Sequence, residues 1–164
     1  TMFGAIRSQA FRQNVRQAYQ KRHFVQSSPI LSRFQDLAQS VRSAYPISEI
    51  TTSELNSSLS SPDKPIIIDV REKEEQVEGV IPGAITIPRG VLERDVERLA
   101  GSVDELNDKK DKKVVLYCAG GVRSLLAAES LIRLGYKKEN IFSLEGGYQK
   151  WEKAGFGVEQ YGKK

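Results

Sequence analysis

Two short runs of β-branched and aliphatic residues constrain the fold of this chain most strongly. Pro65–Val70 contains three consecutive isoleucines, and Lys113–Cys118 has the sequence Lys-Val-Val-Leu-Tyr-Cys. The central residues of each run are apolar and do not alternate with polar residues. This pattern predicts strands that are buried on both faces. Strands of this kind occur in parallel sheets that are covered by helices. The two runs therefore predict an α/β domain.

Shorter segments around these runs extend the alternation of strands and helices. Further strands are expected at Ile47–Ile50, Ala84–Ile87 and Ile141–Leu144, which together give a parallel sheet of about five strands. In such sheets the active site lies at the carboxyl ends of the strands. Helices are expected over five segments: Thr51 to about Leu59, Glu72–Glu78, Val91 to about Leu106, Ser124–Leu134, and the segment after Gly147 that carries Trp151, a side chain expected to pack in the core.

Two of these helices are supported by particular residues. Thr51 and Glu54 have the spacing of a capping box, which should begin the first helix. In the third helix, the spacing places Leu92, Val96 and Leu99 on one face. This spacing supports a helix over the whole segment.

Charge divides the chain into two parts. Residues 1–45 carry seven basic residues and one acidic residue, whereas residues 46–164 carry 18 basic and 20 acidic residues. The net charge of +4 therefore belongs to the first part, and the nearly neutral second part does not indicate a nucleic-acid partner. We predict a basic segment over 1–45 and one folded domain over 46–164.

The basic segment has the composition of a mitochondrial transit peptide. It is rich in Arg and Ser, poor in acidic residues, and amphipathic if Phe3–Tyr19 is a helix. Arg22–Ser27 also resembles the pattern Arg-x-Phe-x-x-Ser of two-step matrix processing, which would leave Ser32 as the mature N-terminus. These features predict recognition by the mitochondrial import and processing machinery and location in the matrix. The alternative is a basic tail that binds a partner or is disordered, and composition predicts disorder over 1–45.

Several classes of protein are excluded by what the sequence lacks. No apolar run approaches the length of about 20 residues that crosses a bilayer. The single cysteine, Cys118, excludes an internal disulfide and any multi-thiolate metal site. The only histidine is His23, so the body has no imidazole for a Cys–His hydrolase or a His-ligated metal. We expect no metal and no organic cofactor.

Cys118 is the candidate nucleophile, because it stands where a buried strand ends and a helix is about to begin. The intervening loop contains Gly120, Gly121 and Arg123. Adjacent glycines let backbone N–H groups turn inward, and both a helix N-terminus and a guanidinium favour an anion. Such a loop stabilises a thiolate and can hold an oxyanionic group of a substrate. The alternative is a small buried cysteine that serves only packing.

The segment Cys118–Ser124 resembles the active-site loop of the rhodanese family, Cys-x-x-Gly-x-Arg. Two further segments match signatures of this family in the family's order, Asp69–Pro88 upstream and Gly146–Trp151 downstream. The three motifs together span almost the whole body of the chain. Each motif alone is a weak signal, and the three in order are a strong one.

Two positions depart from the family pattern. Val80 stands where the family commonly has His, and we expect this position to be structural. Gly120 stands where two-domain thiosulfate sulfurtransferases have a Lys that helps to bind the thiosulfate anion. The absence of this lysine leaves Arg123, with Arg71 as a second candidate, to bind the anion. It also suggests a single-domain enzyme with different preferred substrates. The basic segment over 1–45 adds the expectation of the mitochondrial type.

The resemblance implies a sulfurtransferase with a rhodanese-like α/β fold, helices on both faces of the sheet, and a monomeric or weakly dimeric state. Cys118 takes the outer sulfur of thiosulfate or a related donor, becomes a persulfide, and passes the sulfur to cyanide, glutathione or a protein thiol. Arg123 and Arg71 would bind the donor, and Asp69 would support the loop. The other residues expected to contact substrate are Ala119, Gly120, Gly121, Val122 and Ser124, of which Ser124 is also expected to cap the following helix.

Two other functions stay open on the sequence. One is a module that carries a persulfide to a single protein partner or serves only for docking. The other is a cysteine phosphatase or arsenate reductase, which fits less well. Phosphatase loops have five residues between Cys and Arg, whereas four separate Cys118 from Arg123, and Tyr117 stands where phosphatases commonly have His.

Overall fold

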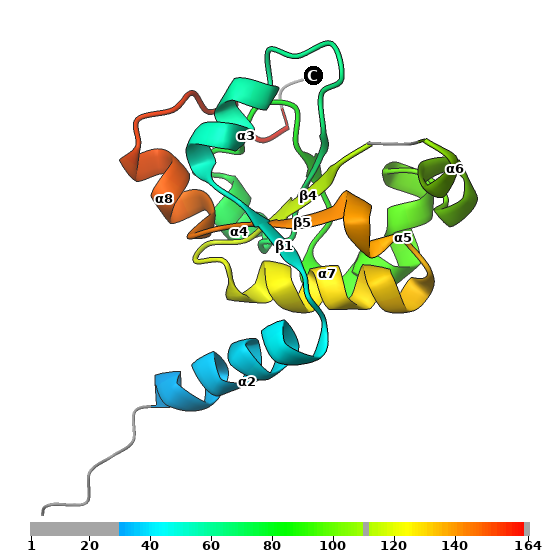
Figure 1. Ribbon diagram of the computed structural model, residues 1–164. Coiled ribbons are helices and arrows are strands. Elements are labelled where there is room, and N and C mark those ends of the chain that lie inside the picture. The colour runs from blue at the N-terminus through cyan, green and yellow to red at the C-terminus, as the bar shows by residue number, and fades with distance from the viewer. Residues whose placement is uncertain (1–29, 110–111, 163–164) are drawn as a thin grey trace, which may run out of the picture. The chain divides into compact units, whose positions relative to one another are not determined.

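The computed structural model describes residues 30–109 and 112–162 (Figure 1). One sheet of five parallel strands has the order β1-β5-β4-β2-β3. This confirms the predicted fold class, and each expected strand is present within one or two residues of its predicted bounds. The strands are β1 (Ser48–Ile50), β2 (Ile66–Asp69), β3 (Ile85–Thr86), β4 (Val114–Tyr117) and β5 (Ile141–Leu144).

Helices connect the strands, as parallel pairing requires. Short 3-10 helices precede α5 and β5. The helical elements are α2 (Ile30–Ala44), α3 (Thr52–Ser58), α4 (Lys73–Gln76), η1 (Arg89–Val91), α5 (Leu92–Leu99), α6 (Val103–Asp108), α7 (Val122–Leu134), η2 (Lys138–Asn140) and α8 (Gly147–Lys153).

The central strand β4 supplies both hydrophobic cores, because successive side chains of a strand point to opposite faces. Val114, Leu116 and Cys118 pack with residues of α5, α6 and α7 on one face. Val115 and Tyr117 pack with residues of α3 and α8 on the other. Figure 1 shows α7 and α5 on one side of the strands and α3 and α8 on the other. This two-sided burial explains why the β4 sequence is apolar throughout.

The predicted capping box begins helix α3. The Thr51 hydroxyl accepts a hydrogen bond from the backbone N–H of Glu54 at 3.2 Å, and the Glu54 carboxylate accepts one from the N–H of Thr51 at 2.9 Å. On the α8 side of the same core, Trp151 is fully buried, as predicted. Its indole N–H donates to the carbonyl of Gly157 at 3.0 Å, which ties the end of α8 to the segment after it.

The predicted single helix from Val91 to about Leu106 is wrong, because the chain forms α5 and α6 as separate helices. Gly101 lies between them with φ of +130°, a backbone conformation that cannot continue a right-handed helix. Ser102 then caps α6 by accepting a hydrogen bond from the N–H of Glu105 at 3.2 Å. Gly101 therefore prevents α5 from continuing, and Ser102 begins α6.

The same break changes the packing of the predicted apolar face. Leu92 and Val96, which the helical spacing placed on one face, are buried. Leu99, on the same face, is the last residue of α5 and remains 38% exposed. The core on this side is completed instead by Leu106, which α6 brings in.

The predicted disorder of residues 1–45 is wrong for residues 30–44, which form helix α2. Ala38 and Val41 of this helix are buried, and Arg42 forms an ion pair with Glu49 at 2.9 Å. The expected mature N-terminus, Ser32, lies within α2. The predicted amphipathic helix at residues 3–19 and the processing pattern at residues 22–27 lie outside the described residues.

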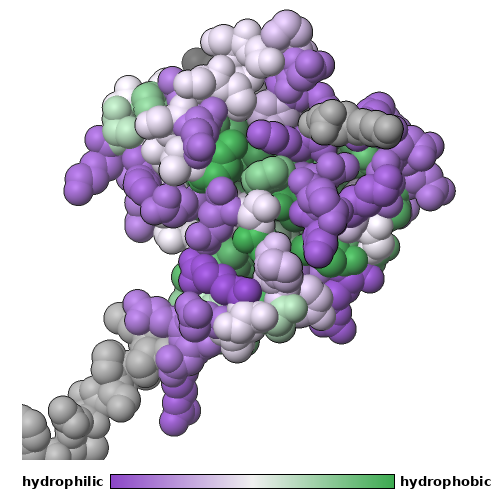
Figure 2. Space-filling view, in the orientation of Figure 1, coloured by the Kyte–Doolittle hydropathy of each residue, from purple (hydrophilic) through white to green (hydrophobic). Residues whose placement is uncertain are grey.

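Hydrophilic side chains cover most of the face seen in Figure 2, and hydrophobic side chains show mainly near its centre. Among the helices that the structure describes, none is long and apolar enough to span a bilayer.

Candidate active site

Cys118 follows the last residue of β4, at the carboxyl end of the central strand. Its thiol is free, and the residue is only 1% exposed. The Sγ atom accepts a hydrogen bond from the backbone N–H of Gly121 at 3.1 Å, and the thiol lies 3.7 Å from the hydroxyl of Ser124, to which it donates. The loop therefore folds back so that one of its own N–H groups contacts the sulfur.

Gly121 makes this return possible. It has φ of +94° and occupies the N-cap position of α7. A Cβ at this position would lie 3.2 Å from the backbone N of Gly146, which is tighter than most real contacts. The sequence therefore needs glycine here for both conformation and space.

The first turn of α8 holds the loop from the other side. The N–H of Tyr148 donates to the carbonyl of Cys118 at 2.8 Å, and the N–H of Gln149 donates to the carbonyl of Ala119 at 3.0 Å. Gly147 makes the close approach possible, because a Cβ there would lie 2.6 Å from the carbonyl oxygen of Ala119. Two carbonyls of the loop are thus bonded to α8.

Ser124 does not cap α7, which corrects the prediction. The cap position belongs to Gly121, and Ser124 lies inside the first turn, where its hydroxyl donates to the Gly121 carbonyl at 3.1 Å. It also shares a hydrogen bond of 2.8 Å with the hydroxyl of Ser143, a buried residue of β5. Sequence reasoning missed Ser143, although a serine in an otherwise apolar strand was a usable signal.

Arg123 lies in the first turn of α7 and forms a two-bond ion pair with Glu75 of α4. The distances are 2.6 Å from Nη2 to Oε1 and 2.8 Å from Nη1 to Oε2. The side chains are 29% and 34% exposed, so the pair lies at the rim of the site. Sequence reasoning included Glu75 in a motif but did not predict this contact.

The ion pair keeps both groups charged. Hydrogen bonds from Arg123 lower the pKa of Glu75 from 4.5 to about 2, against an opposing effect of burial, and a backbone bond from Glu72 lowers it further. The hydrogen bonds to Glu75 in turn raise the pKa of Arg123. At neutral pH, the rim of the site therefore holds a guanidinium and a carboxylate.

Arg71, the second predicted anion ligand, is 2% exposed and is held by protein groups. Its Nη2 donates to the Asp69 carboxylate at 2.8 Å and to the carbonyl of Gly79 at 2.6 Å, and Nη1 donates to the carbonyl of Glu75 at 3.1 Å. The guanidinium also lies 3.9 Å from the centre of the Tyr148 ring. Contact between Arg71 and substrate stays a prediction, and this geometry favours a structural role.

Asp69 is fully buried and serves the same network. Its carboxylate accepts from the N–H of Arg71 at 2.9 Å and from the Tyr117 hydroxyl at 2.7 Å. Burial and the charge of Asp69 raise the pKa of Tyr117, which keeps the phenol protonated as a donor. Asp69 thus supports the loop through Tyr117, the residue before Cys118, and makes no direct bond to the loop.

A family model described as the rhodanese-like domain matches residues 51–154, which include the strands, the cysteine loop and α8. The chain belongs to the rhodanese-like family. Sulfurtransferases are among its homologues. It is 36% identical over 106 residues to "Putative sulfurtransferase YtwF" of Bacillus subtilis, a match that covers 65% of this chain and 91% of that protein.

Other proteins with different names are also similar to this chain. The chain is 36% identical over 94 residues, 57% of its length, to a tRNA uridine(34) hydroxylase of Hamiltonella defensa, of which it covers 25%. A solved structure from Rhodopseudomonas palustris, of unknown function and named a "possible tyrosine phosphatase", is 31% identical, with a TM-score of 0.62. That match covers 77% of this chain and 93% of that one.

The tip of the rhodanese-like loop is open. Gly120 is exposed, and Ala119 and Val122 are partly exposed. A Cβ at Gly120 would meet only the Gln149 side chain, at an ordinary 3.7 Å. The structure therefore has room for a side chain where the two-domain enzymes resembled here have lysine.

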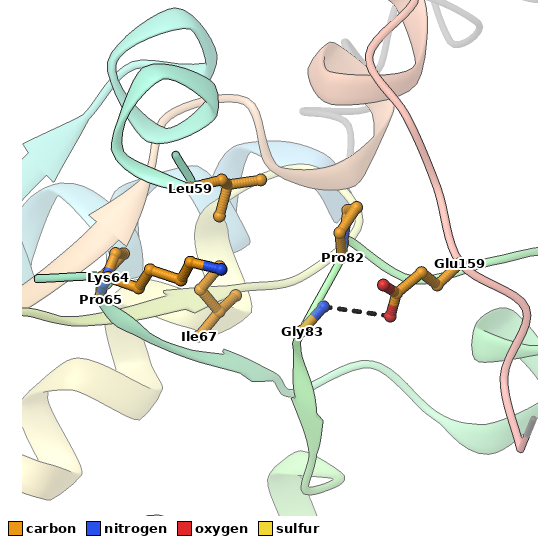
Figure 3. A pocket seen from close by; sticks show the side chains of 7 residues that line it. All are labelled: Leu59, Lys64, Pro65, Ile67, Pro82, Gly83 and Glu159. Carbon is orange, nitrogen blue, oxygen red and sulfur yellow. Dashed lines mark hydrogen bonds between the residues drawn. The ribbon is translucent and has the colours of Figure 1, made fainter. Parts of the chain in front are cut away.

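A separate cavity of about 220 Å³ lies near the amino ends of β2 and β3, whereas Cys118 follows the carboxyl end of β4. Figure 3 shows Glu159 on one side, where its carboxylate accepts a hydrogen bond from the N–H of Gly83 at 3.1 Å, and Lys64 on the other. The cavity is therefore no part of the cysteine site. Over the described ranges, no group of three or more His, Cys, Asp or Glu residues could hold a metal ion.

Proposed function

We propose that the chain is a sulfurtransferase that moves sulfane sulfur through a persulfide on Cys118. The observation that carries the proposal is the contact of the Cys118 sulfur with the N–H of Gly121 at 3.1 Å, beside the first turn of α7. A backbone donor and a helix N-terminus stabilise negative charge on sulfur. The family and its sulfurtransferase homologues support the same chemistry.

In the first step, the Cys118 thiolate attacks the outer sulfur of thiosulfate or a related donor. A bond forms between Sγ and that sulfur, the sulfur–sulfur bond of the donor breaks, and sulfite leaves with the electron pair. The persulfide carries the negative charge on its terminal sulfur, and N–H groups of the loop stabilise it. Because Cys118 is almost completely buried, the site suits donors whose transferable sulfur lies at the end of the molecule.

In the second step, a nucleophilic acceptor attacks the terminal sulfur and releases the Cys118 thiolate. Cyanide gives thiocyanate, and a thiolate such as glutathione gives a new persulfide. The reaction needs no general base, which agrees with the lack of histidine after His23. The sequence of two transfers is ping-pong covalent catalysis.

The test is intact mass and turnover of the full chain, with Cys118→Ser as the control. Incubation with thiosulfate should add about 32 Da, one sulfur atom, and cyanide or glutathione should remove it. The Cys118→Ser variant should gain nothing. No gain with any sulfane donor would refute the proposal and favour a docking module. A gain that persists with every small acceptor would favour relay to a protein thiol.

We further propose that residues 1–45 direct the chain to the mitochondrial matrix, on the strength of their basic, acid-poor composition alone. A fluorescent fusion of the full chain should enter the matrix of isolated mitochondria and become protected from protease. Replacing Arg7, Arg12 and Arg16 with Gln should block entry. Import that is unaffected by these changes would contradict the proposal.

A further inference from the structure

Glu75 binds both terminal nitrogens of Arg123, which are the groups that a bound anion would otherwise contact. Its two carboxylate oxygens accept hydrogen bonds from both terminal nitrogens of the guanidinium, at 2.6 and 2.8 Å. This two-bond geometry is the same as the one by which arginine binds a sulfonate or carboxylate of a ligand. An anionic donor therefore meets a cation that already has an anionic partner.

Glu75 is also fixed in place. Its Oε2 accepts a third hydrogen bond, from the N–H of Glu72 at 3.0 Å, and its backbone carbonyl accepts from Arg71 at 3.1 Å. Both contacts lie within the motif that precedes and forms α4. Rotating the carboxylate away to free Arg123 would break the bond to Glu72 as well as the ion pair.

Other cations around the loop are paired in the same way. Arg71 is paired with Asp69 at 2.8 Å. A Cβ added at Gly146 would meet the Lys150 side chain, whose ammonium group is paired with Glu145 at 2.8 Å. Beyond Glu75, the segment from Glu72 to Glu78 adds three acidic residues and one lysine. The surroundings of Cys118 therefore provide little net positive charge for a doubly charged donor.

We propose that Glu75 sets the charge class of the sulfur donor: by neutralising Arg123, it favours donors with one negative charge over a dianion such as thiosulfate. This inference rests on the proposed function and refines it. The attack of the Cys118 thiolate on the donor follows the same chemistry as in the proposed function. Sγ bonds to the terminal sulfur, and the donor's sulfur–sulfur bond breaks, so that a dianion releases sulfite and a thiosulfonate releases a sulfinate, each with the bonding electron pair.

Thiosulfate and methanethiosulfonate form a matched pair of probes. Both present a terminal sulfur bonded to an oxidised sulfur, and they differ because a methyl group replaces one charged oxygen. We expect Glu75→Gln to raise kcat/KM for thiosulfate relative to methanethiosulfonate by about tenfold, the size expected for one nearby charge with partial screening. Gln keeps the length of the side chain and an oxygen that can accept from Arg123. Glu74→Gln removes the same charge from the same helix without touching Arg123, and should leave the ratio within about twofold.

Ionic strength gives a second test on the unaltered protein. Salt screens the repulsion of the more highly charged donor, so the same ratio should rise with added KCl. A ratio that falls with salt overturns the inference, as does a folded Glu75→Gln protein whose ratio changes by less than about twofold. Failure of both donors to add sulfur to Cys118 would instead refute the proposed function, so the two failures are distinguishable.

Discussion

Arg71 and Arg123 both contact Glu75, one through its backbone carbonyl and the other through its carboxylate. Arg71 is 2% exposed, and its N–H groups donate to protein oxygens. Its guanidinium lies against the Tyr148 ring. Arg123 is 29% exposed and has a single carboxylate partner at the rim. The two arginines share Glu75 as a partner, yet one is enclosed by protein groups and the other is partly exposed. Burial and partners, more than residue type, therefore distinguish the two cations.

The two arginines should differ most clearly in what they contribute to stability. Arg71→Met should destabilise the protein by about 3–5 kcal/mol, because it leaves the buried Asp69 carboxylate without its cation. Urea unfolding of the variant and the parent protein measures the effect. Arg123→Met should cost less than about 1 kcal/mol, since a partly exposed ion pair is weak. Equal losses of stability in the two variants would contradict a structural role for Arg71 that Arg123 does not share.

The charge of Arg123 should contribute to activity with an anionic donor. Arg123→Met should lower kcat/KM for thiosulfate by about tenfold, because Glu75 would then act on the donor as an uncompensated negative charge. Steady-state kinetics with thiosulfate and cyanide measures it. Arg123→Lys keeps the charge but loses the planar fork, and it should recover part of the loss. An Arg123→Met enzyme with parental kinetics would show that this cation does not contribute to donor binding.

A cation added at the tip of the loop should also favour thiosulfate. Gly120 is exposed, and a Cβ there makes only an ordinary 3.7 Å contact with Gln149. We expect Gly120→Lys to raise kcat/KM for thiosulfate by about fivefold, through an ammonium group near the bound anion. Gly120→Gln controls for the added side chain. If both variants gain equally, charge is not the cause.

The Glu75–Arg123 pair should make the stability of the protein weakly dependent on pH. The pKa of Glu75 is lowered in the folded protein to about 2, against an ordinary 4.5. Its contribution is therefore fully present above about pH 4.5 and is lost as the pH falls toward 2. The difference in urea midpoint between the parent protein and Glu75→Gln should shrink over that range. The contribution should stay below about 1 kcal/mol because the pair is partly exposed, and a difference that is constant with pH would contradict it.

Local and periodic signals in the sequence predicted much of the fold. Apolar composition located β2 and β4, and the spacing of Thr51 and Glu54 located the start of α3. The break between α5 and α6 was also encoded, since Gly101 can end a helix and Ser102 with Glu105 has the spacing of a cap. The helical periodicity of the apolar residues continues across this break, so it predicted one helix where the chain forms two. Here local backbone chemistry overrides periodicity.

The site was predictable where it depends on neighbours in the chain and not where it depends on tertiary contacts. Cys118 at a strand end followed from the sequence. The pairing of Glu75 with Arg123 did not, because 48 residues separate them and any exposed arginine has several acidic candidates. Ser124 was assigned a cap for lack of knowledge that Gly121 adopts a left-handed conformation. In the structure Gly121 takes the cap position, and the Ser124 hydroxyl contacts Cys118 and Ser143.

The bonds from Tyr148 and Gln149 to the loop carbonyls also have a consequence for synthesis on the ribosome. Cys118 and its loop leave the exit tunnel well before α8 does, because the chain emerges from the N-terminus. Until residues 147–149 follow, the carbonyls of Cys118 and Ala119 lack their α8 partners and the loop is held from one side only. The nascent chain thus completes its reactive centre among its last folding steps, when almost the whole domain has been made.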